Sequence, residues 1–166
     1  MKTPFAFALA TLIAISSITA RAATFFPERK LDASILAEVV NSGGFMAPGF
    51  VNTTVYTIKK SGDIERTSYH RGDLTRVEQS VVWVGKMNAE VQLRLERAIA
   101  TIHEGKLVDI DPSAPTGADA QNIAYNVNQN GKLVTVANRG GNFHTYALKQ
   151  KAALTVMHLL ENAIRQ

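Results

Sequence analysis

The chain contains no cysteine among its 166 residues. This absence excludes a disulfide framework, thiol catalysis, thiolate zinc sites and cysteine-ligated clusters. It also excludes a lipid anchor attached to a cysteine behind an export signal. A domain of this size without cross-links must rely on its hydrophobic core for stability.

The chain has only a small excess of positive charge, because its formal net charge is +4. Its acidic and basic residues are interspersed. No basic stripe occurs, and no series of aromatic residues interleaves with basic ones. Nucleic-acid grooves are built from such features. We therefore expect no nucleic-acid partner.

Long apolar runs are absent except at the N-terminus, where residues 1–22 have the pattern of a secretory signal peptide. Lys2 precedes an apolar run, and Ala20 and Ala22 occupy the −3 and −1 positions of a cleavage site. The run is short for a transmembrane helix, so an uncleaved anchor is the weaker alternative. We expect an exported protein, periplasmic or secreted, without stable membrane insertion after cleavage. Loss of Lys2 and Arg21 would lower the net charge from +4 to +2.

The remaining chain is expected to form an N-terminal arm, residues 23–32, and one domain, residues 33–166. β-Branched and aromatic residues with period-two alternation predict strands in the first half of this domain. The expected strands are 33–40, for which a short helix is the alternative, 51–60, 64–71 and 75–86. The sequence Lys-Ser-Gly-Asp at 60–63 predicts a tight turn.

The apolar period then changes to that of a helix over residues 88–104. Asn88 is the expected N-cap, and Gly105 the expected stop. Residues 108–121 contain two prolines and no periodicity, which predicts a long loop. A second hairpin is expected around Asn130-Gly131, since Asn-Gly between alternating apolar residues is a strong hairpin signal.

The chain ends in a second amphipathic segment, residues 146–166, whose apolar helical face consists of Ala153, Val156, Met157, Leu160 and Ile164. This order predicts an α+β fold. In it, an antiparallel meander and a second hairpin form a sheet, and both helices pack on one face.

Residues that could bind a metal lack the spacing of known sites. His70, His103, His144 and His158 show no metal-binding motif. Asp109, Asp111 and Asp119 lack the calcium-loop order and are better explained as solvated turn residues. We expect no metal and no cofactor.

Catalytic and phosphate-binding motifs are missing too. Ser42 precedes two glycines, but this is not the G-x-S-x-G nucleophile elbow. The pairs Gly43-Gly44 and Gly140-Gly141 do not fit either glycine-rich phosphate loop, and are better explained by backbone conformation at turns. We expect a protein that is not an enzyme and has no catalytic residue.

Val39 and the stretch Ser42-Gly43-Gly44-Phe45 are followed by an expected strand and helix. Asp119-Ala120, Tyr125 and Val127 come next, and then the C-terminal helix. With these residues in this order, the chain resembles the emfourin-like group of small bacterial domains. The named member of that group inhibits the metalloprotease protealysin. The resemblance implies a non-enzymatic domain that binds another protein. The export signal and the second aromatic residue at Phe50 depart from the group's pattern.

The leading hypothesis is an exported protein-binding domain with a metallopeptidase as candidate target. Its predicted contact residues are Ser42, Gly43, Gly44, Phe45, Met46 and Phe50, with the aromatic residues as anchors. The alternative for Phe45 and Phe50 is that they pack into the core. An envelope-associated module that binds a small ligand is the second hypothesis, and an unrecognised hydrolase or metal enzyme ranks last.

Overall fold

The computed structural model describes residues 32–43, 51–71, 78–114, 121–140 and 144–165. Within these ranges the chain forms eight strands and two helices. They are β1 (Ile35–Ser42), β2 (Val51–Lys59), β3 (Asp63–Arg71), β4 (Glu78–Lys86), α1 (Ala89–Ala100), β5 (Leu107–Asp109), β6 (Asn122–Gln129), β7 (Lys132–Arg139), β8 (Thr145–Leu148) and α2 (Lys151–Ile164). The signal peptide and nearly all of the N-terminal arm lie outside the described residues, so both remain predictions.

All eight strands belong to one antiparallel sheet in the order β4-β3-β2-β1-β6-β7-β8-β5. The expectation of an antiparallel sheet with two helices is therefore confirmed. β1 lies inside the sheet, because it pairs with β2 on one side and with β6 on the other. β4 and β5 are the two edge strands.

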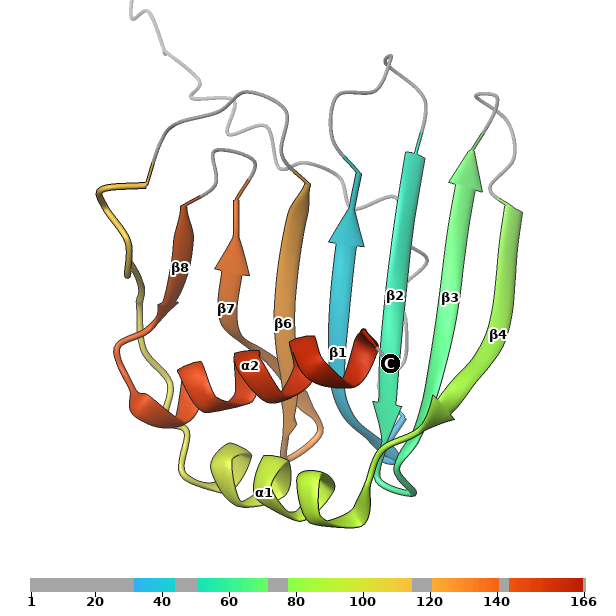
Figure 1. The fold of residues 1–166 in the computed structure, drawn as a ribbon, viewed down its shortest axis with the longest axis horizontal. Coiled ribbons are helices and arrows are strands. Elements are labelled where there is room, and N and C mark those ends of the chain that lie inside the picture. The colour runs from blue at the N-terminus through green and yellow to red at the C-terminus, as the bar shows by residue number, and fades with distance from the viewer. Residues whose placement is uncertain (1–31, 44–50, 72–77, 115–120, 141–143, 166) are drawn as a thin grey trace, which may run out of the picture. The chain divides into compact units, whose positions relative to one another are not determined.

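Both helices lie on one face of the sheet (Figure 1). α2 crosses the strands from β8 toward β2, and α1 runs below it. The core forms between this helix layer and the sheet, and its largest fully buried side chains come from both. They are Tyr125, Ile58, Leu95, Leu148, Leu160, Val39, Val127, Val136 and Val156.

Local signals explain where several elements begin. Asn88 caps α1 as predicted, because its side-chain oxygen accepts a hydrogen bond of 2.8 Å from the Glu90 backbone N–H. The turn between β6 and β7 has positive φ at both Asn130 and Gly131, 53° and 86°. Two positive φ angles are typical of a two-residue hairpin turn whose twist matches the strands.

Three predicted boundaries are wrong. α1 ends at Ala100, short of Gly105, and Thr101 caps it. β5 lies mostly inside the stretch predicted as a long loop, and β8 includes residues 146–148, which were predicted as the start of the C-terminal helical segment. These two short strands pair with each other, with Leu107 opposite Leu148. A strand of three or four residues depends on this distant partner and carries too few residues for a periodic signal.

Candidate functional site

Four of the seven exposed large apolar side chains among the described residues follow one another on the edge strand β4. Val81 is 56% exposed, Val82 46%, Trp83 63% and Val84 39%. We call these four residues the β4 edge. A contiguous exposed apolar group of this kind on a soluble domain is typical of an interaction site.

The strand register explains why Val82 is exposed. Val39 of β1 lies opposite Tyr56, Tyr56 opposite Arg66, and Arg66 opposite Val82. Directly opposed residues point to the same face, so Val82 lies on the face that carries the helices. Figure 1 shows α2 reaching only as far as β2, so this face of β3 and β4 has no helix in front of it.

Val81 and Trp83 point to the opposite face of the sheet. Val81 lies opposite Thr67, and Trp83 lies opposite Glu65. Because neighbouring residues alternate between faces, the β4 edge presents apolar surface on both faces of the sheet. A partner that covered it would have to lie along the strand, in the plane of the sheet, to contact both faces at once.

The ends of β4 carry features that limit uncontrolled pairing. Glu78 and Lys86 are exposed and flank the apolar centre. The register shifts between Trp83 and Gly85, so Val84 is the extra residue of a β-bulge. Charges and bulges at an edge are common means of preventing aggregation. The regular part of the open strand therefore runs from Glu78 to Trp83.

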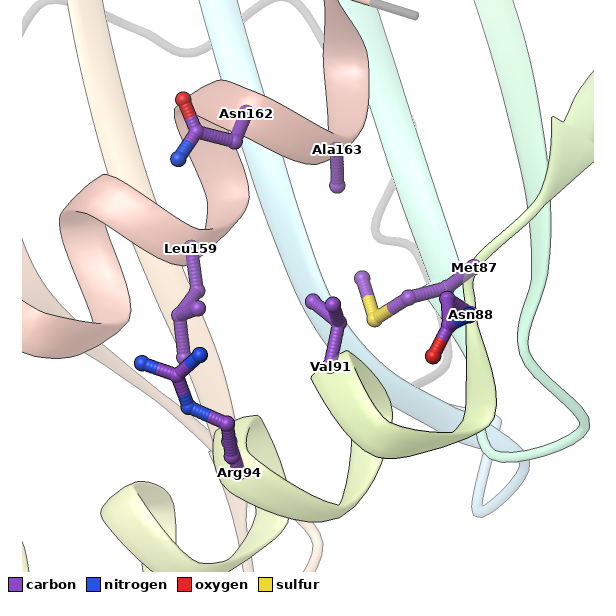
Figure 2. A pocket seen from close by; sticks show the side chains of 7 residues that line it. All are labelled: Met87, Asn88, Val91, Arg94, Leu159, Asn162 and Ala163. Atoms are coloured by element: carbon purple, nitrogen blue, oxygen red, sulfur yellow. The ribbon is translucent and has the colours of Figure 1, made fainter.

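A groove of about 420 Å³ lies between the two helices. Figure 2 shows Leu159 and Ala163 of α2 pointing toward α1, which carries Val91 and Arg94, with Met87 and Asn88 at the junction before α1. Asn162 of α2 also lines the groove. Met87, Leu159 and Ala163 are already buried by protein atoms. A ligand in this groove would gain little further apolar contact, so it is the weaker candidate site.

Two polar clusters link distant parts of the chain. The buried Tyr125 hydroxyl donates to Glu161 Oε1 at 2.8 Å, and Arg139 Nη2 donates to the same oxygen at 2.8 Å. Burial and the hydrogen bond to Glu161 raise the pKa of Tyr125 well above its ordinary value of 10.0. Since the hydroxyl keeps its proton and serves as a donor, this cluster ties α2 to β6 and β7.

The second cluster joins His144, just before β8, to Asp109 in β5, with 2.7 Å between Nδ1 and Oδ2. Asp109 also accepts a hydrogen bond from the Asp111 backbone N–H at 3.0 Å. Within the described ranges, no group of three or more His, Cys, Asp or Glu residues is arranged to hold a metal ion. The contacts of this pair thus join one edge strand to its neighbour.

The predicted contact stretch begins at Ser42, the last residue of β1, and ends at Phe50, just before β2. The Ser42 hydroxyl donates to the Asn122 carbonyl at 3.2 Å, and the Gly43 N–H donates to the Asn52 carbonyl at 2.9 Å. Both groups thereby extend the hydrogen bonding of the sheet. Gly44, Phe45, Met46 and Phe50 lie outside the described residues, so their contact role remains a prediction.

Sequence reasoning identified residues 75–86 as a strand but missed the exposure of its apolar side chains. A signal was present, because a strand at the end of a predicted three-strand meander has a neighbour on one side only. Four consecutive apolar residues, at 81–84, are typical of a strand covered on both faces. On an edge strand they indicate a surface that another chain can cover.

No family model matches this chain, and a search of curated proteins gives no match. The helices of the described part are too short or too polar to cross a membrane.

Proposed function

We propose that the protein is an exported, non-enzymatic domain that binds another protein through the β4 edge. The observation that carries this proposal is the exposure of Val81, Val82, Trp83 and Val84 on a strand with an open side. An extended segment that adds to such a strand gains backbone hydrogen bonds, and alternate side chains provide specificity. Trp83 is the expected anchor, since tryptophan is enriched among residues that dominate binding energy.

In this proposal the meander of residues 51–86 presents the contact strand, and the hairpin of residues 122–139 belongs to the part of the sheet next to the helices. Support comes from the strand order, in which β4 ends one side of the sheet and β6 and β7 lie near its other end. The predicted signal peptide would deliver the domain to the periplasm or the medium. No cofactor and no metal take part in this function.

A metallopeptidase is the proposed target class, as the resemblance to emfourin-like domains implies. Val39, Tyr125 and Val127, which carry part of that resemblance, are buried, and Val39 lies opposite Tyr125 in the sheet. These three residues belong to the core, so they give no support to a particular contact surface. The inhibitor role therefore depends on Ser42 to Phe50 and is tested separately from the β4 edge.

The test is quantitative capture of envelope and secreted proteins of the source organism by the purified chain. The double variant V81T/W83S should lose at least nine-tenths of a partner bound at the β4 edge, because it removes the apolar anchors from that exposed site. Val108→Thr is the matched control, since Val108 is 38% exposed on the other edge strand. If V81T/W83S retained every captured partner, binding through the β4 edge would be contradicted.

The loop is examined with F45A/F50A in the same capture and in assays of captured metallopeptidases. Loss of inhibition with an unchanged melting temperature would place the peptidase contact on the loop. Loss of the melting transition would place both aromatic residues in the core. Inhibition that F45A/F50A leaves unchanged in a folded protein would contradict the role of the loop.

The groove between the helices favours the second candidate, a small-ligand module. Its apolar floor and the Arg94 side chain beside Leu159 suit an apolar molecule with an anionic end (Figure 2). Calorimetric titration with decanoate is the probe. Binding that Leu159→Trp abolishes and V81T/W83S leaves intact would favour this candidate, and the absence of heat would reject it.

A further inference from the structure

We infer that the β4 edge pairs with the β4 edge of a second copy of this chain, forming a two-fold symmetric dimer with a continuous sheet. The inference rests on the proposed function, in which β4 is a contact strand, and it names the partner at this edge. The predicted peptidase contact at Ser42 to Phe50 is a separate stretch of chain.

The apolar content of β4 is self-complementary about Val82. Val82 is the middle residue of the nine-residue strand Glu78–Lys86. An antiparallel pair with its two-fold axis at this residue sets Val82 opposite the partner's Val82. It also sets Val81 opposite the partner's Trp83, and Trp83 opposite the partner's Val81. Aromatic residues opposite β-branched ones are favourable cross-strand pairs.

This register brings apolar side chains of the two copies together on both faces of the sheet. A two-fold axis perpendicular to the sheet keeps each face on its own side, so the two Val82 side chains meet on the face that carries the helices. That face is clear at β4, because α2 reaches only as far as β2 (Figure 1). Val81 and Trp83 contact the partner's Trp83 and Val81 on the opposite face. Within each chain, Val81 lies opposite Thr67 on this face, and Trp83 lies opposite Glu65.

Neighbouring registers fit less well. An axis at Val81 sets Val82 opposite the partner's Ser80 and Trp83 opposite the partner's Gln79, so apolar side chains face polar ones. An axis at Trp83 brings the bulge at Val84 into the centre, where the ladder is irregular. The register centred on Val82 keeps three consecutive apolar pairs in the regular part of the strand.

Charge favours the antiparallel direction as well. The two strands then run so that the end with Glu78 meets the partner's end with Lys86. A parallel pair would instead bring the two Glu78 residues to one end and the two Lys86 residues to the other. Like charges close together across a sheet are destabilising.

The assembly closes at two copies. A pair formed by the same edge of both chains is isologous, and it consumes β4 in each chain. The remaining open edge is β5, which has only three residues and ends in Asp109. So short an edge offers few free backbone groups for a further chain.

The test uses sedimentation equilibrium of the full chain and of variants that place charge on the symmetry axis. The unaltered protein should have twice the mass of one chain at micromolar concentration. V82K alone and V82E alone should each be at least tenfold weaker dimers, because like charges would face each other at the axis. An equimolar mixture of V82K and V82E should restore the dimer, because lysine would then face glutamate.

Val108→Lys is the matched control, with a valine of similar exposure on the other edge strand, and it should stay dimeric. Circular dichroism checks that each variant folds. If a variant does not fold, the mass of the unaltered protein alone shows whether the chain is a dimer. A monomeric unaltered protein, or a mixture that stays monomeric, would overturn the inference. In a monomeric protein, loss of captured partner in V81T/W83S would still support β4 as a contact strand, so the two proposals can fail separately.

Discussion

Val39 and Val82 are the same residue type on the same face of one sheet, joined by a row of opposed residues across four strands. Val39 is 0% exposed and Val82 is 46% exposed. The strand pattern does not distinguish them, since both lie in apolar, β-branched segments. The difference is the helix layer, which lies over the part of the sheet that holds β1 and ends before β4 (Figure 1).

The two strands extend this comparison. In β1 the first five residues are buried, whereas in β4 every residue except Gly85 is exposed. An apolar strand left bare at an edge favours aggregation unless a partner covers it or charges protect it. This contrast is why we assign stability to one part of the sheet and binding to the other.

The largest effect expected from this contrast is on the free energy of unfolding. Leu160→Ala should destabilise the protein by about 2–5 kcal/mol, because the Leu160 side chain of α2 is fully buried and its truncation leaves a cavity. Val82→Ala should change the free energy of folding each subunit by at most about 0.5 kcal/mol, as at other surface positions. Both substitutions are made in the V81T/W83S protein, in which self-association is removed. Urea unfolding then gives the change in free energy of unfolding for each. Equal losses for the two changes would mean that Val82 is packed like a core residue.

A smaller effect is expected where polar contacts hold the helix layer on the sheet. Glu161→Ala would leave the buried Tyr125 hydroxyl and Arg139 without their common acceptor, at a cost of about 1–3 kcal/mol. Glu161→Gln should lose less, since an amide oxygen still accepts one hydrogen bond. Urea unfolding checks both variants. If Glu161→Ala matched the unaltered protein, the cluster would not stabilise the packing of α2.

The smallest effect concerns an exposed turn between β2 and β3. The Ser61 hydroxyl donates to Asp63 at 2.6 Å and holds the pKa of Asp63 below its ordinary value of 3.8. A lowered carboxyl pKa stabilises the folded state above pH 3.8, and this contribution disappears as the pH falls through the folded-state pKa. Ser61→Ala should raise the pKa of Asp63 toward 3.8 in an NMR titration. An unchanged titration midpoint would show that the hydrogen bond has no such effect.

Much of the fold is predictable from local sequence. Asn88 and Asn130-Gly131 act through their own backbone neighbourhoods, so the helix start and the hairpin turn could be predicted. β5 and β8 could not, because each is stabilised by the other from more than 35 residues away in the chain. Their pairing depends on a tertiary contact that local propensity does not encode.

The candidate site was predictable only in part. Residues 81–84 were recognised as strand, but their exposure depends on where α2 ends relative to β4, which is a property of packing between distant elements. The cluster of Tyr125, Arg139 and Glu161 was missed for the same reason. Ser42 and Gly43, predicted as contact residues, donate to carbonyls of the neighbouring strands β6 and β2.

Cysteine cross-linking is the most direct test that β4 is the covered edge, because the chain contains no other thiol. Opposed residues of an antiparallel pair have Cα atoms roughly 4.5–5.5 Å apart, which suits a disulfide. Oxidised V82C should therefore run as a covalent dimer on a non-reducing gel, while V108C on the other edge stays monomeric. A V82C protein that stays monomeric, or cross-linking of V108C to the same extent, would contradict the account.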